Sequence, residues 1–506
     1  MALEPEHVTA GAVPVARPSM VVTIAVFTRA LGVVYLIAFL SLRVQILGLF
    51  GSTGILPIGE YLTAVAERFG GTRWDVLPTL LWLGASDAVL LRLCDAGVVL
   101  AALAAAGIAP GPSLLALWTL YLAFVSAGRV FLSFQWDMLL LETGLLAVFV
   151  APWAVWPRLD ATREPSRLGV WLLRWLLFRL MFASGVVKLL HDDPSMPTWH
   201  DLTALAYHYE TQCLPPWTAW YAHHLPLWWH RVSCALMFVI ELGVPFLIFG
   251  PRAARLIAAV AFIGFQLLIV VTGNYTFFNW LTMALALVLC DDRALAAVLP
   301  GRGGNASAVL PHPPPGRLRT AVGVPLMLVL LVASAATFAR QMGGGEAPPA
   351  LARPLLQRLA PLRSVNGYGL FARMTTVRNE IVIEGSDDGT TWLPYEMPWK
   401  PGDVTRRPTF VAPHQPRLDW QMWFAALTPY RSNPEQWFAR LLGRVLEGEP
   451  SVLALFAANP FPNAPPRFVR AVVWEYRFST PGDASGAWWR REWRGVYAPT
   501  IQRRPD

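Results

Sequence analysis

Long apolar segments recur along the first two thirds of this chain of 506 residues. Most of them hold the roughly 17–25 residues that a helix needs to cross the hydrocarbon core of a bilayer. The segments are 21–42, 87–108, 113–131, 135–150, 168–190, 231–249, 253–272, 277–290 and 321–338. Lipid offers no hydrogen-bond partners, so a backbone that crosses it must satisfy itself within helices. The sequence therefore predicts a multi-pass α-helical membrane protein with about eight or nine transmembrane helices.

The composition fits this class and argues against others. Hydrophobic residues make up 55% of the chain and charged residues 15%, which is too little charge for a fully water-exposed surface. The formal net charge of +8 comes almost entirely from arginine, but the arginines are scattered between apolar segments, which argues against nucleic-acid binding. The four cysteines form no CxxC pair, so we expect buried free thiols. Nothing in the sequence indicates a metal or a cofactor.

The chain divides by composition into four parts. Residues 1–20 form a polar tail without the pattern of a cleaved signal peptide, and residues 21–340 hold the apolar segments. Residues 341–350 form a Gly- and Pro-rich linker, and residues 351–506 are expected to form a soluble β-rich domain with a hairpin turn at Asp388-Gly389. We expect strands at 380–384, 390–395, 468–478 and 488–497, and short helices at 77–91 (interfacial), 433–446 and 451–459.

Arginine residues predict how the spans are oriented. They concentrate in alternate loops, at 158–167, 252–255 and 293–319. Loops enriched in this way face the cytoplasm, so the N-terminal tail is predicted to be cytoplasmic. With an odd number of spans, the interfacial loop 191–230 and the C-terminal domain then lie on the extracytoplasmic side. That side is periplasmic if the membrane is a bacterial cytoplasmic (inner) membrane, and luminal if it is the endoplasmic-reticulum membrane.

The segment 135–150 carries polar side chains at membrane depth. Gln135 and Glu142 are seven residues apart and share a helix face, whereas Asp137 points to the other side. A buried carboxylate needs a cation. The candidate cations are Arg129, Arg174 and Arg179. Such a cluster is either an ion-pair network that fixes helix packing or the lining of a polar cavity.

Lys188 lies near the end of the segment 168–190 and is one of two lysines in the chain. On a helix it shares a stripe with Arg174 and Met181. A lysine near a helix end can extend its ammonium group to the interface or pair with an anion. A lysine desolvated beside other cations can instead lose its proton and act as a base or nucleophile. A structural role at the interface or in an ion pair is favoured for Lys188, and it is the candidate catalytic residue in the alternative.

The loop 191–230 concentrates histidine, carboxylate and tryptophan side chains. Its candidate site residues are Trp199, His200, His208 and Glu210. His200 and His208 are eight residues apart and form no HExxH-type motif, so a hydrogen-bonded interfacial loop is favoured over a metal site. Further along, Asn274 and Asn279 flank a tight turn between two apolar segments, where asparagine commonly caps helix ends.

Four stretches resemble the lipase maturation factor family. They read FLSFQWDMLLLETGLLAVF, SGVVKLLHDDPSMPTWHDLTALAYHYETQCLPP, GNYTFFNWLTMALAL and APHQPRLDWQMWFAAL. The last stretch contributes a C-terminal motif of four residues, His414, Arg417, Asp419 and Trp420. The resemblance implies a multi-pass membrane protein, resident in the endoplasmic reticulum in eukaryotic members, that secreted lipases need to reach an active fold.

The membrane half is also distantly similar to the membrane domain of vitamin K-dependent γ-carboxylase. In that group an apolar helix ends in Gly-x-x-Lys and is followed by a tryptophan, and Gly185, Lys188 and Trp199 match this pattern. The similarity implies that Lys188 stands where the carboxylase has its active-site base.

Three hypotheses about function follow from the sequence. In the favoured one, the chain is a non-enzymatic maturation factor that contacts secreted clients, lipases by resemblance, through the loop 191–230 and the C-terminal domain. In the second, it is a membrane enzyme in which Lys188 acts as a base on a lipid, a quinone or a peptide. In the third, it is a purely structural partner in a secretion complex.

Overall fold

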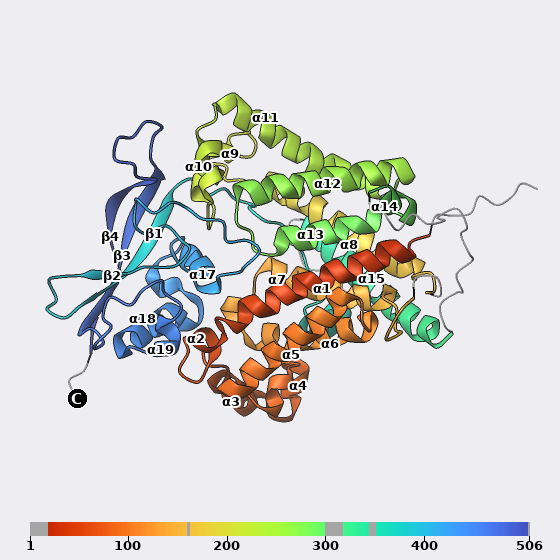
Figure 1. Cartoon of the computed structure of the whole chain (residues 1–506), viewed down its shortest axis with the longest axis horizontal. Helices are drawn as coiled ribbons and strands as arrows, with labels where there is room; N and C mark the ends of the chain where they lie inside the picture. Colours follow the sequence, from red (N-terminus) through yellow and green to blue (C-terminus); the bar gives the residue numbers. More distant parts are fainter. Residues whose placement is uncertain (1–18, 159–161, 299–316, 344–350, 504–506) are drawn as a thin grey trace, which may run out of the picture.

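The computed structural model describes residues 19–158, 162–298, 317–343 and 351–503. Figure 1 shows a bundle of long helices at one end and a β-sheet with short helices at the other, with α9 (Ala204–Thr211) and α10 (Trp217–His223) between them. The predicted tail up to residue 18, the connector at 299–316 and the linker at 344–350 lie outside the described residues.

Seven helices in the described part of the chain are long and apolar enough to cross a membrane. They are α1 (Val21–Arg43), α5 (Asp87–Ala106), α6 (Pro110–Ala127), α8 (Arg167–Leu190), α11 (Leu227–Phe238, continued to Phe249), α12 (Arg252–Thr272) and α15 (Arg317–Met342). A shorter apolar helix is α13 (Phe278–Ala286, continued to Leu289). Helix α7 (Gln135–Val150), which was predicted to span the membrane, has 16 residues and is not among the seven candidate spans. The prediction of a multi-pass helical membrane protein is confirmed.

The remaining helices are short and connect these elements. They are α2 (Ile46–Phe50), α3 (Ile58–Phe69), α4 (Arg73–Val76), α14 (Asp292–Val298) and α16 (Arg353–Leu359). The interfacial helix predicted at 77–91 is wrong, because a 3₁₀ turn ends at Leu83 and α5 begins only at Asp87. Helix α6 begins at Pro110, since a first helical turn needs no N–H from that residue. It ends before Arg129, whose φ of 50° is not helical.

Helix α1 packs closely against α5 and supports the bundle. The crossing depends on Gly32, where an added Cβ would lie 2.5 Å from the backbone nitrogen of Ala105. Further along α1, Tyr35 and Phe39 meet the ring of Tyr121 edge-on, with centroids 5.9 Å and 5.5 Å apart. These edge-to-face contacts are the arrangement that aromatic quadrupoles prefer, and they fix α6 beside α1.

The described C-terminal residues form a four-stranded antiparallel sheet in the order β2-β1-β3-β4. The strands are β1 (Arg378–Ser386), β2 (Leu393–Tyr395), β3 (Phe468–Phe478) and β4 (Trp489–Gln502). The four predicted strands are confirmed, and β3 has the predicted bounds. Strand β2 starts later than predicted because Asp388 Oδ1 accepts the backbone N–H groups of Thr390 and Thr391 and holds both in the turn.

Three helices pack beside the sheet, and the sequence predicted them unevenly. Helix α18 (Trp437–Glu447) was expected, whereas α19 (Pro450–Leu453) is much shorter than the predicted helix at 451–459. Helix α17 (Arg417–Ala425) was not predicted. Nearly all its side chains are buried, charged ones included, so it lacks the alternation of apolar and polar faces that reveals an amphipathic helix.

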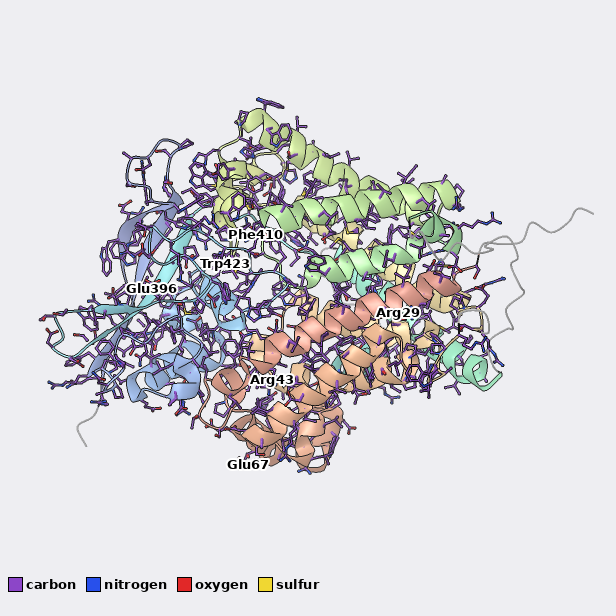
Figure 2. The ribbon with its side chains drawn as sticks, viewed as in Figure 1. Arg29, Arg43, Glu67, Glu396, Phe410 and Trp423 are labelled. Carbon is purple, nitrogen blue, oxygen red and sulfur yellow. The ribbon has the colours of Figure 1, made fainter. Side chains whose placement is uncertain are left out.

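One hydrophobic core runs through both ends of the molecule. Leu31 of α1 and Leu418 of α17 belong to the same cluster of buried side chains. Figure 2 shows Phe410 and Trp423 on the side of the sheet region that faces the helices. The indole N–H of Trp423 donates to the carbonyl of Thr211 at the end of α9, 3.0 Å away. The sheet region is therefore packed firmly against the bundle and the loop 191–230.

Candidate functional site

Helix α7 brings Asp137 into a buried ion pair with the C-terminal region. Its two carboxylate oxygens accept hydrogen bonds from Arg417 of α17 at 3.0 Å and 2.9 Å, and both side chains are 0% exposed. The hydroxyl of Tyr121 donates to the same carboxylate at 2.5 Å, and the carbonyl of Phe131 accepts from Arg417 at 2.7 Å. A bidentate arginine–carboxylate pair fixes orientation as well as charge. This pair therefore holds α17 in register on α7.

Glu142, on the next turns of α7, is satisfied in the same way. One oxygen pairs with Arg179 of α8. The other accepts the hydroxyl of Tyr368 at 2.6 Å and the backbone N–H of Asn366 at 3.1 Å. The guanidinium of Arg179 also donates to the carbonyl of Asn366 at 3.0 Å. Residues from α7, from α8 and from the chain beyond α16 thus form one buried polar cluster.

Gln135 adds two hydrogen bonds between the helical bundle and the C-terminal region. Its side-chain amide donates to the carbonyl of Gly369 and accepts the N–H of Gly369, each at 3.1 Å. We call the whole set the junction network. It consists of Gln135, Asp137, Glu142, Arg179, Asn366, Tyr368, Gly369 and Arg417.

Of the three candidate cations, Arg179 alone contacts a carboxylate of α7. Arg129 pairs with Glu435 at 2.9 Å and lies over the ring of Tyr61. Arg174 donates to the carbonyl of Val288 at 3.0 Å, in the 3₁₀ turn Leu287–Leu289 that follows α13. The partner of Asp137 comes instead from the C-terminal motif.

Asn274 holds loops together and does not cap a helix. Its amide nitrogen donates to the carbonyls of Leu214 and Thr409 at 3.0 Å and 2.9 Å. Its oxygen accepts the N–H groups of Val411 and Ala412 at 2.8 Å and 3.0 Å. All its bonding capacity therefore ties the loop 191–230 to the segment that leads into α17.

The rest of the C-terminal motif lies at the same boundary. His414 Nδ1 is 2.9 Å from the hydroxyl of Ser41 on α1, and burial lowers the pKa of His414 to about 4. Asp419 accepts two backbone N–H groups at 3.0 Å and 2.9 Å, and burial raises its pKa to about 6. Trp420 meets the ring of Trp136 at 4.6 Å. The motif residues are thus positioned to join the two regions.

In the loop 191–230, backbone hydrogen bonds dominate. Trp199 donates to the carbonyl of Phe371 at 2.9 Å, and Glu210 accepts the N–H of Phe478 at 2.7 Å. Burial raises the pKa of Glu210. His200 lies 2.9 Å from Asp192 within the loop. Within the described ranges, no group of three or more His, Cys, Asp or Glu side chains is arranged to hold a metal ion.

Lys188 lies in a different environment, at the wall of a cavity of about 380 Å³ that we call the Lys188 cavity. Its ammonium group donates to both oxygens of Glu241, at 2.9 Å and 2.7 Å, and to the carbonyl of Ser184 at 3.0 Å. The Trp199 ring centroid lies 5.4 Å from the ammonium nitrogen. Four predicted site residues line this cavity, namely Lys188, Trp199, His208 and Asn279. Glu142, His200 and Glu210 are not among its lining residues.

A second hollow, of about 400 Å³, lies between the loop 191–230 and the sheet, and we call it the loop–sheet cleft. Tyr207, Glu210 and His223 line it from the loop, and Val377 and Arg378 line it from the sheet side. It therefore combines the two segments that the sequence predicted to meet clients.

The comparison with known proteins agrees with this two-part architecture. The protein-family model described as "Lipase maturation factor transmembrane domain" matches residues 22–297. A second family model, described as "Lipase maturation factor C-terminal domain", matches residues 364–499. The chain belongs to the lipase maturation factor family. The match spans both the helical bundle and the sheet region, so the resemblance seen in the sequence is confirmed.

Individual members of the lipase maturation factor family align along most of the chain. Lipase maturation factor 2 of Mus musculus and that of Homo sapiens are each 38% identical, over 94% of this chain and 82% of the relative. Lipase maturation factor 1 of Mus musculus is 35% identical, over 94% of this chain and 86% of the relative. No solved structure matches the chain. Nothing in these comparisons favours the membrane-enzyme hypothesis.

Sequence reasoning missed several residues of the Lys188 cavity and of the junction network. Glu241 is the acidic residue of its apolar segment, and that isolated charge could have indicated a cationic partner such as Lys188. Asn366 and Tyr368 gave no such signal, because a polar residue in a loop is ordinary. Their role is visible only in the folded chain.

Proposed function

We propose that this chain is a non-enzymatic membrane factor that helps secreted lipases to mature. One observation carries the proposal: relatives named lipase maturation factors align with 94% of the chain, and both parts of the family architecture are present in order. In this proposal the junction network is structural. It fixes the sheet region on the bundle so that both present one surface to a client.

The placement of charged loops supports a cytoplasmic N-terminus and an extracytoplasmic sheet region. The start of α1 is bonded to Asp292, and the neighbouring Asp291 pairs with Arg252. Val21 and Arg163 line one shallow hollow at this same end. The sheet, α9 and α10 lie at the opposite end of the helices (Figure 1). Arginine-rich loops favour the cytoplasmic side, so the loop–sheet cleft faces the compartment through which secreted proteins pass.

The loop–sheet cleft is the surface that we propose for client contact. It lies where the loop 191–230 meets the C-terminal region, and both contribute its walls. Tyr207 and Val377 are exposed at its edge, whereas Glu210 and Arg378 provide polar groups deeper in. Exposed aromatic and apolar side chains beside polar groups are the composition of protein-binding sites.

The test uses the full chain in cells that lack their own lipase maturation factor and that express a secreted lipase. We expect the ratio of active to total secreted lipase to rise about tenfold or more above the empty-vector level, comparable to a change of about 1.4 kcal/mol in a folding equilibrium. Val377→Asp should abolish most of this gain. Leu393→Asp, an equally exposed apolar position on β2, is the matched control and should retain it.

Two outcomes would contradict the proposal. If the full chain reaches the membrane but the ratio stays at the empty-vector level, the maturation role is wrong. If Val377→Asp and Leu393→Asp lower the ratio equally while both proteins accumulate normally, the cleft is not the client surface. A stop codon after Arg340 is a poor substitute for these variants, because it removes Arg417 and leaves Asp137 buried without its cation.

A further inference from the structure

The Lys188 cavity has the size and lining of a ligand site. Its volume of about 380 Å³ is at the lower end of the range of about 300–1,000 Å³ that small-molecule sites occupy. Apolar side chains from α8, α11, α12 and α13 form most of the wall, among them Leu180, Leu236 and Ile269. A cavity of this size accommodates one lipid chain.

The cavity opens toward the surface of the membrane helices. Leu236 on α11 and Leu268 on α12 belong to its lining and are 53% and 63% exposed. Both residues lie within segments long and apolar enough to cross a bilayer. Figure 1 shows α11 and α12 as neighbouring helices on one side of the bundle. An opening bordered by exposed leucines on such helices faces lipid, so a ligand can enter directly from the bilayer.

The charges in the cavity wall cancel. Lys188 and Glu241 form an ion pair, and the three donors of the ammonium group are all used by Glu241 and Ser184. Burial lowers the pKa of His208 to about 4, so its ring is neutral at pH 7. The lining therefore offers no spare charge for a carboxylate or phosphate group. An uncharged ligand fits this electrostatic environment.

Two buried acceptor atoms in the lining lack a donor. Asn279 is 1% exposed, and its amide nitrogen donates to Gln266 Oε1 at 2.7 Å, which leaves its oxygen without a partner. The Nδ1 atom of His208 is also buried and unpartnered. A buried polar atom without a hydrogen bond costs free energy, so a ligand that supplies donors gains by filling this place.

The hydrogen bonds around His208 favour the tautomer in which Nδ1 is an acceptor. The amide nitrogen of Gln212 donates to the carbonyls of Tyr209 and Thr272, so its oxygen is free to accept the hydroxyl proton of Tyr275. The tyrosine oxygen must then accept from His208 Nε2, which lies 3.1 Å away and carries the ring proton. The neutral ring has its lone pair on Nδ1. Both unpartnered atoms therefore require donors.

We propose that the Lys188 cavity binds an uncharged single-chain lipid with free hydroxyl groups, of the monoacylglycerol class. The acyl chain lies among the apolar side chains of α11 and α12, and the two glycerol hydroxyls donate to Asn279 Oδ1 and His208 Nδ1. The lipid is a bound ligand and undergoes no reaction. This site is separate from the loop–sheet cleft, and its test needs no client protein.

The test uses the purified full chain in phosphatidylcholine nanodiscs with a monoacylglycerol that carries a photoreactive diazirine in its acyl chain. We expect labelling of peptides from α11 and α12. Unlabelled monooleoylglycerol should compete about tenfold better than methyl oleate, which has the chain without the hydroxyl donors, and better than oleate, which carries a charge; tenfold is the scale of about one hydrogen bond. This series uses the unaltered protein, so it does not depend on any variant folding.

Substitutions then locate the site. Ile269→Trp fills the cavity and should reduce labelling about tenfold or more, whereas Val260→Trp, on the exposed face of the same helix, should leave it unchanged. Asn279→Leu removes one acceptor and should reduce the advantage of monooleoylglycerol over methyl oleate. Equal competition by the two esters would overturn the hydroxyl recognition, and stronger competition by oleate would overturn the uncharged class. Equal labelling of the two tryptophan variants would overturn the location.

Discussion

The junction network and the Lys188 cavity each contain a buried ion pair, yet the two are built in different ways. In the first, the carboxylates of Asp137 and Glu142 meet a full set of donors. In the second, the ion pair of Lys188 is complete, but Asn279 and His208, two residues of the lining, each keep a buried atom without a hydrogen-bond partner. In the junction network the side-chain atoms without a partner are the Nε donors of Arg179 and Arg417, whereas in the lining of the Lys188 cavity they are acceptors. Carboxylates that meet their donors stabilise one arrangement of the chain, and acceptors without donors leave capacity for a ligand.

The same contrast separates structure from function within the charged residues of the membrane helices. A buried charge is costly, so each such residue suggests a functional site when only the sequence is known. In this protein the costly groups on α7 serve to join the bundle to the C-terminal region. The Lys188 cavity is where we propose that buried polar groups bind a ligand.

The largest effect is expected from breaking the junction network at its most buried pair. Arg417→Met leaves Asp137 without its cation and should lower the free energy of unfolding by about 3–5 kcal/mol. Thermal unfolding of the detergent-purified chain measures this. Arg440→Met, which breaks an exposed pair with Glu60, is the control and should cost less than about 1 kcal/mol. Equal shifts in the two variants would show that the junction pair is not buried in solution.

Breaking the ion pair in the Lys188 cavity should lower the free energy of unfolding by about 3 kcal/mol. This loss is smaller than that of Arg417→Met, because water can enter the cavity and hydrate the remaining group. Lys188→Met therefore destabilises the protein whether or not Lys188 is catalytic. The double variant Lys188→Met/Glu241→Leu removes both charges and should recover most of the stability. If this variant still supports lipase maturation, Lys188 is structural; if it is stable and inactive, the membrane-enzyme hypothesis gains its first support.

Acidification probes both the junction and the Lys188 cavity. Between pH 7 and pH 5, each buried histidine should lower the free energy of unfolding by about 2 kcal/mol. The unfolded chain binds a proton at each histidine below about pH 6.5, whereas His414 and His208 in the folded chain do so only near pH 4. Stability from these groups is therefore lost as pH falls through that window. His414→Gln should reduce the loss between pH 7 and pH 5, measured by chemical denaturation at both values.

Asp419 should respond with the opposite sign. Its folded pKa of about 6 lies above the usual value, so protonation favours the folded chain and stability rises as pH falls from 7 to 5. Asp419→Asn removes this gain of about 1 kcal/mol and should make acid destabilisation steeper. A flatter profile for Asp419→Asn would contradict the assigned burial of the carboxyl group.

The smallest effect is expected at the edge of the junction network. Gln135→Met removes two neutral hydrogen bonds to the backbone of Gly369 while keeping the side-chain volume, and should cost about 1 kcal/mol. The melting temperature of the purified chain reports this change. A loss as large as that of Arg417→Met would mean that Gln135 supports far more of the network than its two bonds.

The sequence determined the parts of this protein that depend on local physics. Apolar segments became helices because lipid leaves the backbone no other partner, and the alternation in 468–478 became β3 with the expected bounds. The residues also required that the carboxylates of 135–150 meet cations, and Arg179 met one of them.

Only the tertiary structure decided which distant groups would meet. Asp137 and Arg417 are separated by 280 residues, and hydropathy carries no information about a pairing over that distance. Helix α17 escaped prediction for a related reason, since its charged residues are buried by partners far away in the sequence, such as Asp137 of α7 for Arg417. The Lys188 cavity likewise exists because α8, α11, α12 and α13 leave space between them. Periodicity reports the environment of one element, whereas a site is made by the contacts between elements.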